Sequence, residues 1–363
     1  MIKYLYIDDE KDKAKTYIES LQKVGELEID FQQAQTLDKA FLLRNLKDYH
    51  GVLLDLRTDQ ELDENNNISD FTGAEWGQHL RVLSTNGELE NDVPIVLFST
   101  DAKLQQTYFR DLTSNNIFDR FLSKDKTPAN AQKKLISLAN GYKEIIKYKD
   151  NFNSLLKINI SDLDPRIFSR FIGLTDIPTH EYAQMILKDL IYAKGVLINE
   201  KYLAARLGID KDNSTDWESV KAIFDIAKYK GVFSDGWDRW WMFAVDKIFN
   251  KISGTYLNYL DAKERVTILK EKLKLENINY AEPIKENGSY DYWTVCKALG
   301  KPLDSHEAFK VYTRSEPKPW QEYEYISLHA LLEESPAIQE KNITVHPMDK
   351  EKYTLKRAKH NNG

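Results

Sequence analysis

Short apolar runs alternate with amphipathic runs along the first 150 residues. Amphipathic stretches with apolar positions at helical spacing predict five helices, the fourth over 104–112 and the fifth beginning at Pro128. The apolar runs that predict strands cover 2–7, 27–31, 51–56, 94–98 and 117–122. Strands that alternate with helices in this way predict a doubly wound α/β domain with a five-stranded parallel sheet.

The pattern changes after residue 150, where mostly helical stretches are separated by Pro and short polar segments. Amphipathic spacing predicts helices over 181–195, 200–207, 219–230 and 258–275. We expect a helical linker over 141–157, either as a continuous stalk or as two helices with a break near Gly141. A mostly helical, α+β output region then covers 158–345, and the polar, basic stretch 346–363 predicts a disordered tail.

The composition indicates the class of protein. A chain of 363 residues, 42% hydrophobic and 30% charged, indicates a globular protein of two or three domains. No apolar run is long enough to span a bilayer, and the N-terminus lacks the layout of a signal peptide, so we expect a cytoplasmic protein. The single cysteine, Cys296, excludes an internal disulfide and is expected to be a buried thiol.

The charge is unevenly distributed. Residues 1–150 contain 20 Lys+Arg and 26 Asp+Glu, so they account for the whole net charge of −6. The rest of the chain is neutral and lacks the basic excess that nucleic-acid binding usually needs. The aromatic patch at Trp237, Trp240 and Trp241 could bind a partner, although we expect most of these side chains in the core.

Polar residues follow four of the predicted strands. The first strand ends in Asp8-Asp9-Glu10, the third in Asp55, the fourth in Ser99-Thr100 and the fifth in Lys124. In a doubly wound sheet these carboxyl ends meet at one pocket. Carboxylates crowded there repel one another unless a divalent cation joins them, and oxygen ligands suit Mg²⁺. A hydroxyl and a lysine beside the metal are suited to binding a phosphoryl group.

The segments that end in these residues resemble the motifs of the response-regulator receiver family. They are, in chain order, YLYIDDE, GVLLDLR, PIVLFST and FLSKDK, and the resemblance covers about residues 1–140. It implies a protein of two-component signalling whose receiver domain takes a phosphoryl group from a histidine kinase or phosphotransfer protein.

The resemblance assigns a role to each pocket residue. Asp55 would be the phosphoacceptor, and Lys124 would bind the phosphoryl oxygens. The Mg²⁺ ligands would be Asp9, Asp55 and the backbone carbonyl of Arg57, with Asp8 acting largely through water.

Three further residues are candidates for the switch that follows phosphorylation. Ser99 falls at the family's hydroxyl position, with Thr100 beside it, and Phe121 occupies the place of the aromatic switch. Phosphorylation would then alter the face formed by helix four, strand five and helix five, which could mediate homodimerisation or contact the C-terminal region.

The chain departs from the family pattern at three places. Asp125 follows the pocket lysine where the family usually has proline. The loop after Asp55 is lengthened by an insertion, DQELDENNNISD, at 59–70. We interpret this acidic stretch as a solvated flap, with a second metal site as the alternative. Arg57 lies two residues after Asp55, where its side chain can affect access of water to the phosphate.

The output of the C-terminal region is open at this stage. A helix-turn-helix over 181–243 would make the protein a DNA-binding regulator, with 219–230 as recognition helix and 236–241 as wing, but the acidic residues of that helix disfavour this. A protein-interaction module and a phosphate sink without effector are the other hypotheses. No metal-binding histidine spacing, phosphate loop or nucleophile elbow is present, so we expect no enzymatic output.

Overall fold

The computed structural model describes residues 1–22, 25–104, 116–340 and 342–361. The chain forms two compact units, each of which is described by itself. The first contains Met1–Lys188 and Lys230–Trp237, and the second contains Asp189–Tyr229 and Asp238–Gly363. The first unit is therefore larger than the receiver domain expected over 1–140 and takes in the expected linker over 141–157.

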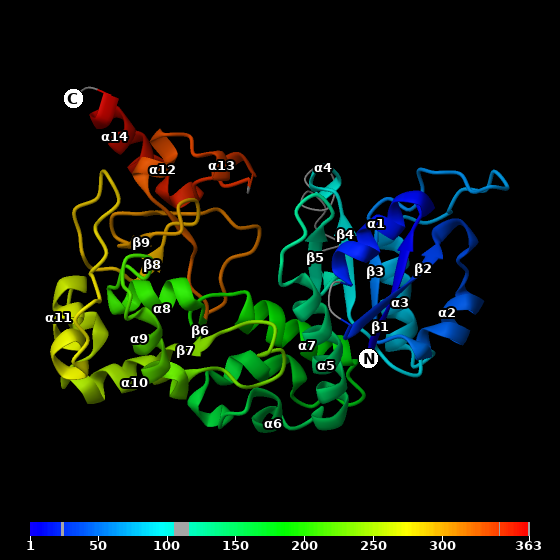
Figure 1. The fold of residues 1–363 in the computed structure, drawn as a ribbon, viewed down its shortest axis with the longest axis horizontal. Coiled ribbons are helices and arrows are strands. Elements are labelled where there is room, and N and C mark those ends of the chain that lie inside the picture. Colours follow the sequence, from blue (N-terminus) through cyan, green and yellow to red (C-terminus); the bar gives the residue numbers. More distant parts are fainter. Residues whose placement is uncertain (23–24, 105–115, 341, 362–363) are drawn as a thin grey trace. The chain divides into compact units, whose positions relative to one another are not determined.

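A five-stranded parallel sheet forms the centre of the first unit (Figure 1). Its strands lie in the order β2-β1-β3-β4-β5, which is the flavodoxin-like order with a switch point between β1 and β3. This confirms the predicted fold class. The strands are β1 (Ile2–Asp8), β2 (Leu27–Gln33), β3 (Gly51–Leu54), β4 (Ile95–Ser99) and β5 (Arg120–Ser123).

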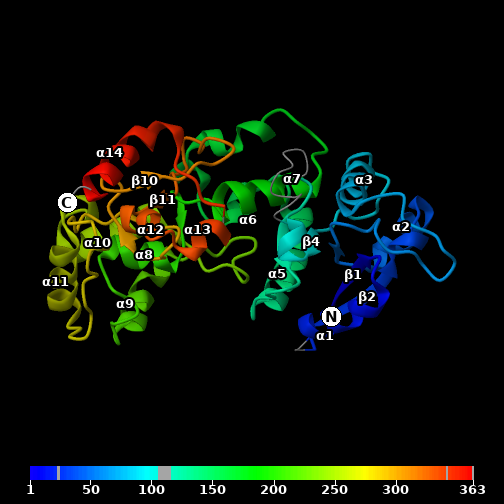
Figure 2. The ribbon, with the colours of Figure 1, turned by 90° about the horizontal axis from the view of Figure 1, so that it is seen from above.

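Helices cover both faces of this sheet, because alternate side chains of each strand point to opposite sides. Leu5 and Ile7 of β1 pack into one core with side chains from α2 (Lys39–Asn45) and α3 (Gly73–Thr85). On the opposite face Tyr4 donates a hydrogen bond to a carbonyl of α5 (Ala131–Tyr148). Figure 2 shows α1 (Lys11–Leu21) and α3 on opposite sides of β1.

The described part of the fourth helix, α4, is Asp101–Lys103. The predicted helix over 104–112 lies, apart from its first residue, outside the described residues.

Most of the expected helical linker over 141–157 is helical. Helix α5 runs through Gly141 without a break and ends at Tyr148. The chain then turns into α6 (Phe152–Leu156) and α7 (Thr179–Gln184), and α7 packs against α5. Residues 141–157 belong to the first unit.

A distant segment, 231–237, completes the first unit by packing on α5. Phe233 fills the space left by Gly141, where a Cβ would lie 2.1 Å from its ring. Ser137 of α5 donates hydrogen bonds to Asp235 and to the carbonyl of Phe233. The Arg120 guanidinium of β5 lies over the Trp237 ring, 5.5 Å from its centroid. The β5–α5 face is thus covered in part by a segment whose chain continues at both ends into the second unit.

The second unit is helical with three two-stranded antiparallel sheets. Its helices are α8 (Glu200–Leu207), α9 (Trp217–Ile223), α10 (Met242–Ser253), α11 (Ala262–Leu273), α12 (Leu328–Leu332), α13 (Pro336–Glu340) and α14 (Lys350–Asn361). Its strands are β6 (Leu197–Ile198), β7 (Trp240–Trp241), β8 (Thr294–Val295), β9 (Pro302–Leu303), β10 (Phe309–Lys310) and β11 (Tyr325–Ile326). These elements agree with the expected mostly helical, α+β region.

The three clustered tryptophans are core residues. Trp237 is buried in the first unit, and Trp240 and Trp241 are buried in the second. They do not form an exposed patch for a partner.

The end of the chain differs from the prediction of a disordered tail. Lys350–Asn361 forms helix α14, because Tyr353 packs edge-on against Phe309 and the Lys352 ammonium donates to the carbonyls of His306 and Ala308. Among the helices in the described residues, none is long and apolar enough to cross a membrane.

Candidate phosphoryl-transfer site

The carboxyl ends of β1 and β3 bring three carboxylates together at the switch point of the sheet. Asp8 ends β1, Asp9 follows it, and Asp55 follows β3. All three are buried, and each offers a carboxylate oxygen within 4.8 Å of the others. The structure therefore brings together the three carboxylates that the sequence analysis placed at this edge.

Close packing fixes the position of Asp55. The Asp55 amide donates to the carbonyl of Ile7 at 3.0 Å, which ties the residue to β1. The first residue of α3, Gly73, lies against its carbonyl, and a Cβ at Gly73 would be 1.7 Å from that oxygen. Only glycine leaves room here, so α3 can begin directly beside the candidate acceptor.

Lys124 joins two of the carboxylates. Its Nζ lies 2.6 Å from Asp55 Oδ1 and 2.7 Å from Asp8 Oδ2. Burial alone would lower the pKa of the Lys124 ammonium, but the charges of Asp55 and Asp8 outweigh it and raise that pKa above its ordinary value. The charged form of Lys124 is therefore favoured where it lies between Asp55 and Asp8.

A second lysine, Lys103 at the end of α4, lies 3.4 Å from Asp55 Oδ2. Lys103 was not among the predicted site residues, because a lysine in the turn after a strand has no distinguishing pattern. The same Asp55 oxygen accepts the amide N–H of Arg57 at 2.8 Å. The Arg57 side chain pairs with Asp59, its Nε lying 2.8 Å from Oδ1.

Asp9 lies in a different environment from the other two carboxylates. Its Oδ2 accepts two backbone N–H groups, those of Gln60 and Glu61, each at 2.8 Å. Burial raises the pKa of the Asp9 carboxyl to about 6, against the effect of those two amides, and the nearby Asp8 adds to the rise. Its other oxygen, Oδ1, is buried and has no hydrogen-bond partner among the described residues.

The two candidate hydroxyls have different surroundings. Ser99 at the end of β4 is fully buried, and its Oγ has no hydrogen-bond partner within the described part of the chain. The Thr100 side chain instead accepts from the Lys103 amide and caps α4. Ser99 is therefore the hydroxyl available to a bound group. Phe121 in β5 is 46% exposed.

The residues present fit a divalent metal. The pocket holds three carboxylates against two lysines, and one carboxylate oxygen, Asp9 Oδ1, is desolvated without a partner. A buried acceptor in this state is costly unless a donor or a cation meets it. Oxygen donors of this kind are the ligands that Mg²⁺ prefers. The Arg57 carbonyl, expected as a further ligand, has no contact that tests that role.

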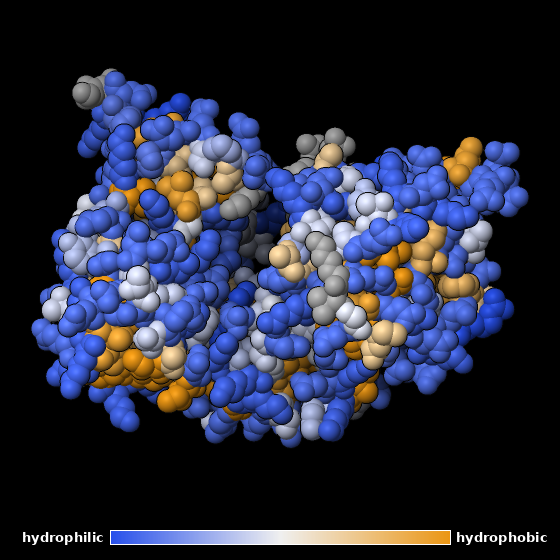
Figure 3. Space-filling view, in the orientation of Figure 1, coloured by the Kyte–Doolittle hydropathy of each residue, from blue (hydrophilic) through white to orange (hydrophobic). Residues whose placement is uncertain are grey.

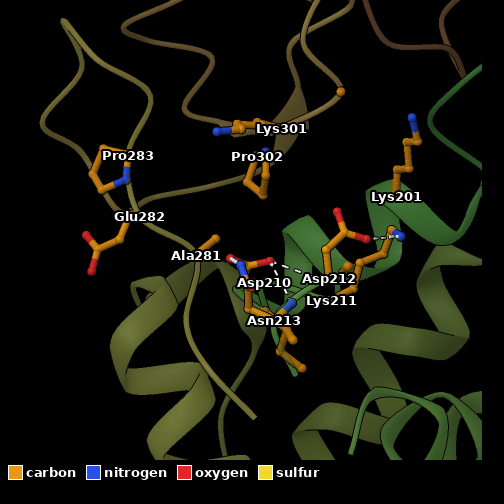
Figure 4. A pocket seen from close by; sticks show the side chains of 13 residues that line it. Lys201, Asp210, Lys211, Asp212, Asn213, Ala281, Glu282, Pro283, Lys301 and Pro302 are labelled. Carbon is orange, nitrogen blue, oxygen red and sulfur yellow. Dashed lines mark hydrogen bonds and ion pairs between the residues drawn. The ribbon is translucent and has the colours of Figure 1, made fainter. Parts of the chain in front are cut away.

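The second unit contains a separate pocket, shown in Figure 4. It has a volume of about 220 Å³. Three lysines and three carboxylates line it: Lys201, Lys211, Lys301, Asp210, Asp212 and Glu282. Asp210 is used by the loop itself, accepting from Asn213, and Asp212 pairs with Lys211. The balanced charge selects no class of ligand, so we assign no role to this pocket.

Solved structures similar to the chain match its N-terminal part. A CheY-like receiver domain from Methylobacillus flagellatus is 22% identical, with 38% of this chain and 98% of that chain covered and a TM-score of 0.28. A receiver-domain protein from Clostridium thermocellum is 16% identical, with 40% and 98% covered and a TM-score of 0.29.

A chain from the complex of the histidine kinase ThkA with the response regulator protein TrrA is also similar. It is 21% identical, with 34% of this chain and 85% of that chain covered and a TM-score of 0.24. No protein-family model matches the sequence, and no curated protein matches it. We draw no functional conclusion from these likenesses, and infer the chemistry of the pocket from its own residues.

Proposed function

We propose that the chain is a cytoplasmic response regulator that accepts a phosphoryl group on Asp55 from a histidine kinase or phosphotransfer protein. The observation that carries the proposal is the state of the pocket around Asp55. A buried aspartate is paired with a buried lysine at 2.6 Å, beside two oxygens, Asp9 Oδ1 and Ser99 Oγ, that lack partners among the described residues.

The chemistry follows from these positions. A carboxylate oxygen of Asp55 attacks the phosphorus of a phosphohistidine, and a P–O bond forms while the P–N bond breaks and its electron pair returns to the imidazole. Lys124 then exchanges its contact with Asp55 for one with a phosphoryl oxygen, and the Ser99 hydroxyl donates to another. Mg²⁺, when bound by Asp9, Asp55 and the Arg57 carbonyl, with Asp8 through water, neutralises charge on the transferring group.

The route to the output starts at β5. Phe121 lies in this strand and Lys124 directly follows it, and Arg120, next to Phe121, contacts Trp237. A movement of Ser99 and Phe121 on phosphorylation would therefore be transmitted to the segment 231–237 through the contact of Arg120 with Trp237. We propose that the signal passes through this segment to the C-terminal region, which acts as a protein-interaction module. Because the segment covers part of the β5–α5 face, we do not propose homodimerisation through it.

DNA binding is not favoured by the contacts of the predicted recognition helix. Lys221 pairs with Glu218 at 2.7 Å, and Lys228 pairs with Asp238 at 2.7 Å. Cations already neutralised within the protein add little to phosphate binding. The expected wing is taken up by buried tryptophans. For the same region we propose no enzymatic activity.

Labelling with a phosphodonor tests the acceptor. We expect the full chain, incubated with a small radiolabelled phosphodonor and Mg²⁺, to take up acid-stable, hydroxylamine-sensitive phosphate. EDTA and the substitution Asp55→Asn should each abolish the label, because they remove the metal and the nucleophile. Asp70→Asn, at an exposed aspartate of the insertion, should label like the unsubstituted chain. Full labelling of Asp55→Asn would show that the acceptor lies elsewhere.

A further inference from the structure

The insertion after Asp55 is folded against the pocket. Asp63 accepts the amides of Asn65 and Asn67 at 2.8 Å each, which closes a turn inside the insertion. At its base the Thr58 hydroxyl donates to the carbonyl of Phe71 at 2.6 Å. Figure 3 shows apolar groups among the hydrophilic atoms of this loop, and Leu62 is one of its exposed apolar side chains. The loop is thus folded, and most of its residues are exposed, as expected of a solvated flap.

The base of the insertion holds the Asp9 carboxylate. Successive amides of Gln60 and Glu61 both donate to Oδ2, so this oxygen is saturated. The carboxylate plane is thereby fixed, and Oδ1 is the one oxygen left without a partner among the described residues. These donors are backbone groups, so the arrangement depends on the path of the loop and not on the side chains at 60 and 61.

Gln35 ties this loop to β1. It lies in the short 3₁₀ turn Ala34–Thr36 that follows β2, and its Nε2 donates to the carbonyl of Glu61 at 2.6 Å and to that of Asp9 at 3.4 Å. The bonds form a closed circuit from the Asp9 carboxylate through Glu61 and Gln35 back to the Asp9 backbone. The Gln35 Oε1 atom is buried and has no partner within the described residues.

We propose that the insertion positions Asp9 as a one-oxygen ligand for Mg²⁺, with Gln35 as the positioning residue that holds the loop in place. The inference rests on the proposed function for the use of the site. Mg²⁺ requires near-ideal octahedral geometry and tolerates poorly placed ligands badly. A carboxylate already fixed by two amides loses little freedom when the ion binds, and groups that orient metal ligands typically contribute 10- to 100-fold in affinity.

Mg²⁺ binding to the full chain, measured by calorimetry without any phosphodonor, tests this role. Gln35→Met has nearly the same volume but no donor, and should weaken Mg²⁺ binding by about tenfold. Gln32→Met is the matched control, because the side chain of Gln32, near the end of β2, donates to Gln33 and Thr36 and to no other group among the described residues. Gln60→Ala should also bind like the unsubstituted chain, since it keeps the amide that Asp9 accepts.

Two further measurements separate positioning from folding. The denaturation midpoint of each variant without Mg²⁺ should stay near that of the unsubstituted chain, while the Mg²⁺-induced rise in that midpoint should shrink for Gln35→Met alone. If Gln35→Met does not fold, Gln35→Asn replaces it, because its amide is one methylene too short to reach Glu61. Unchanged Mg²⁺ affinity in the folded Gln35 variant would overturn this inference and leave the proposed function standing. No Mg²⁺ binding by the unsubstituted chain would overturn both.

Discussion

The first unit buries charged residues at both edges of one sheet, and the two groups differ in how completely their atoms are paired. At the carboxyl edge lie Asp8, Asp9, Asp55 and Lys124. At the amino edge, Arg81 of α3 lies between Asp92 and Asp119, at 3.1 Å and 2.8 Å. Composition and burial are similar, so neither property distinguishes a structural cluster from a functional one.

In the amino-edge group each guanidinium nitrogen and each carboxylate oxygen has a partner. Arg81 also donates to the carbonyls of Ile117 and Val93, at 3.0 Å each. Asp119 Oδ2, which contacts Arg81, also accepts the Ile95 amide, and Asp119 Oδ1 accepts the Tyr142 hydroxyl. Asp92 Oδ2 accepts from the amide and ring of His180. A closed network of this kind stabilises the fold.

The carboxyl-edge group leaves Asp9 Oδ1 and Ser99 Oγ without partners among the described residues. The cost of burying these two atoms is not offset by a hydrogen bond among the described residues, which is typical of a site that binds a ligand. Between these two groups, unpaired buried atoms, and not buried charge as such, distinguish the pocket from the closed network. Each prediction below tests that distinction.

The largest expected effect is on the closed network. Arg81→Met leaves Asp92 and Asp119 buried without their common cation, and should lower the free energy of unfolding by about 3–5 kcal/mol. Urea denaturation measures this change. The exposed pair of Lys39 with Glu88 provides the control, because Lys39→Met should change stability by less than about 1 kcal/mol. A similarly small change for Arg81→Met would show that the network does not stabilise the fold.

An intermediate effect of opposite sign is expected in the pocket. Asp9→Asn removes an ionised group whose burial is unfavourable, and without Mg²⁺ it should raise the free energy of unfolding at pH 7 by about 1–2 kcal/mol. The same variant should bind Mg²⁺ more weakly. Denaturation with and without Mg²⁺ measures both changes, with Asp70→Asn as the exposed control. A lower free energy of unfolding for Asp9→Asn than for the unsubstituted chain in Mg²⁺-free buffer would contradict this. It would show that the buried Asp9 carboxylate does not destabilise the fold when no metal is bound.

The smallest expected effect is a difference between the two groups in how the free energy of unfolding depends on pH. The pKa of Asp9 in the folded chain, about 6, lies above that of an unfolded aspartate, so Mg²⁺-free protein should lose stability as pH rises from about 4 to 6 through this group.

Asp92 has the opposite sign: burial favours its protonated form, but the His180 hydrogen bond and Arg81 hold its pKa below the ordinary value. Its contribution is present above about pH 4 and is lost as pH falls further. Unfolding free energies from pH 3 to 7 for the unsubstituted chain and Asp9→Asn should differ in slope only in the upper window. A slope unchanged by the substitution would assign that titration to another group.

Much of the first unit could be predicted because four of its five strands carry two signals in the sequence. Uniform apolar runs give the buried strands, and the polar residue that ends each run gives the edge where the pocket lies. Asp55 and Lys124 are 69 residues apart, yet both are found by this rule, and their contact follows from the sheet order.

The remaining features depend on information that no local pattern carries. The amides of Gln60 and Glu61 act through the backbone, so their residue types do not reveal them. Gln35 lies after β2 in a turn without a recognisable motif. The packing of Phe233 on Gly141 joins residues 92 positions apart through shape alone. The tail was predicted as disordered from composition, which does not register a single anchoring contact such as Tyr353 on Phe309.

The packing of 231–237 on α5 also determines when the first unit can be finished during synthesis. Domains usually fold in the order in which they leave the ribosome. Here the site-bearing sheet is translated early, but the side chains that close the surface of α5 are made only after more than forty residues of the second unit. The surface of α5 at Gly141 therefore stays uncovered in the nascent chain until Phe233 and Trp237 have been synthesised. A chain shortened to end between residues 189 and 229 would retain every pocket residue and lack that cover.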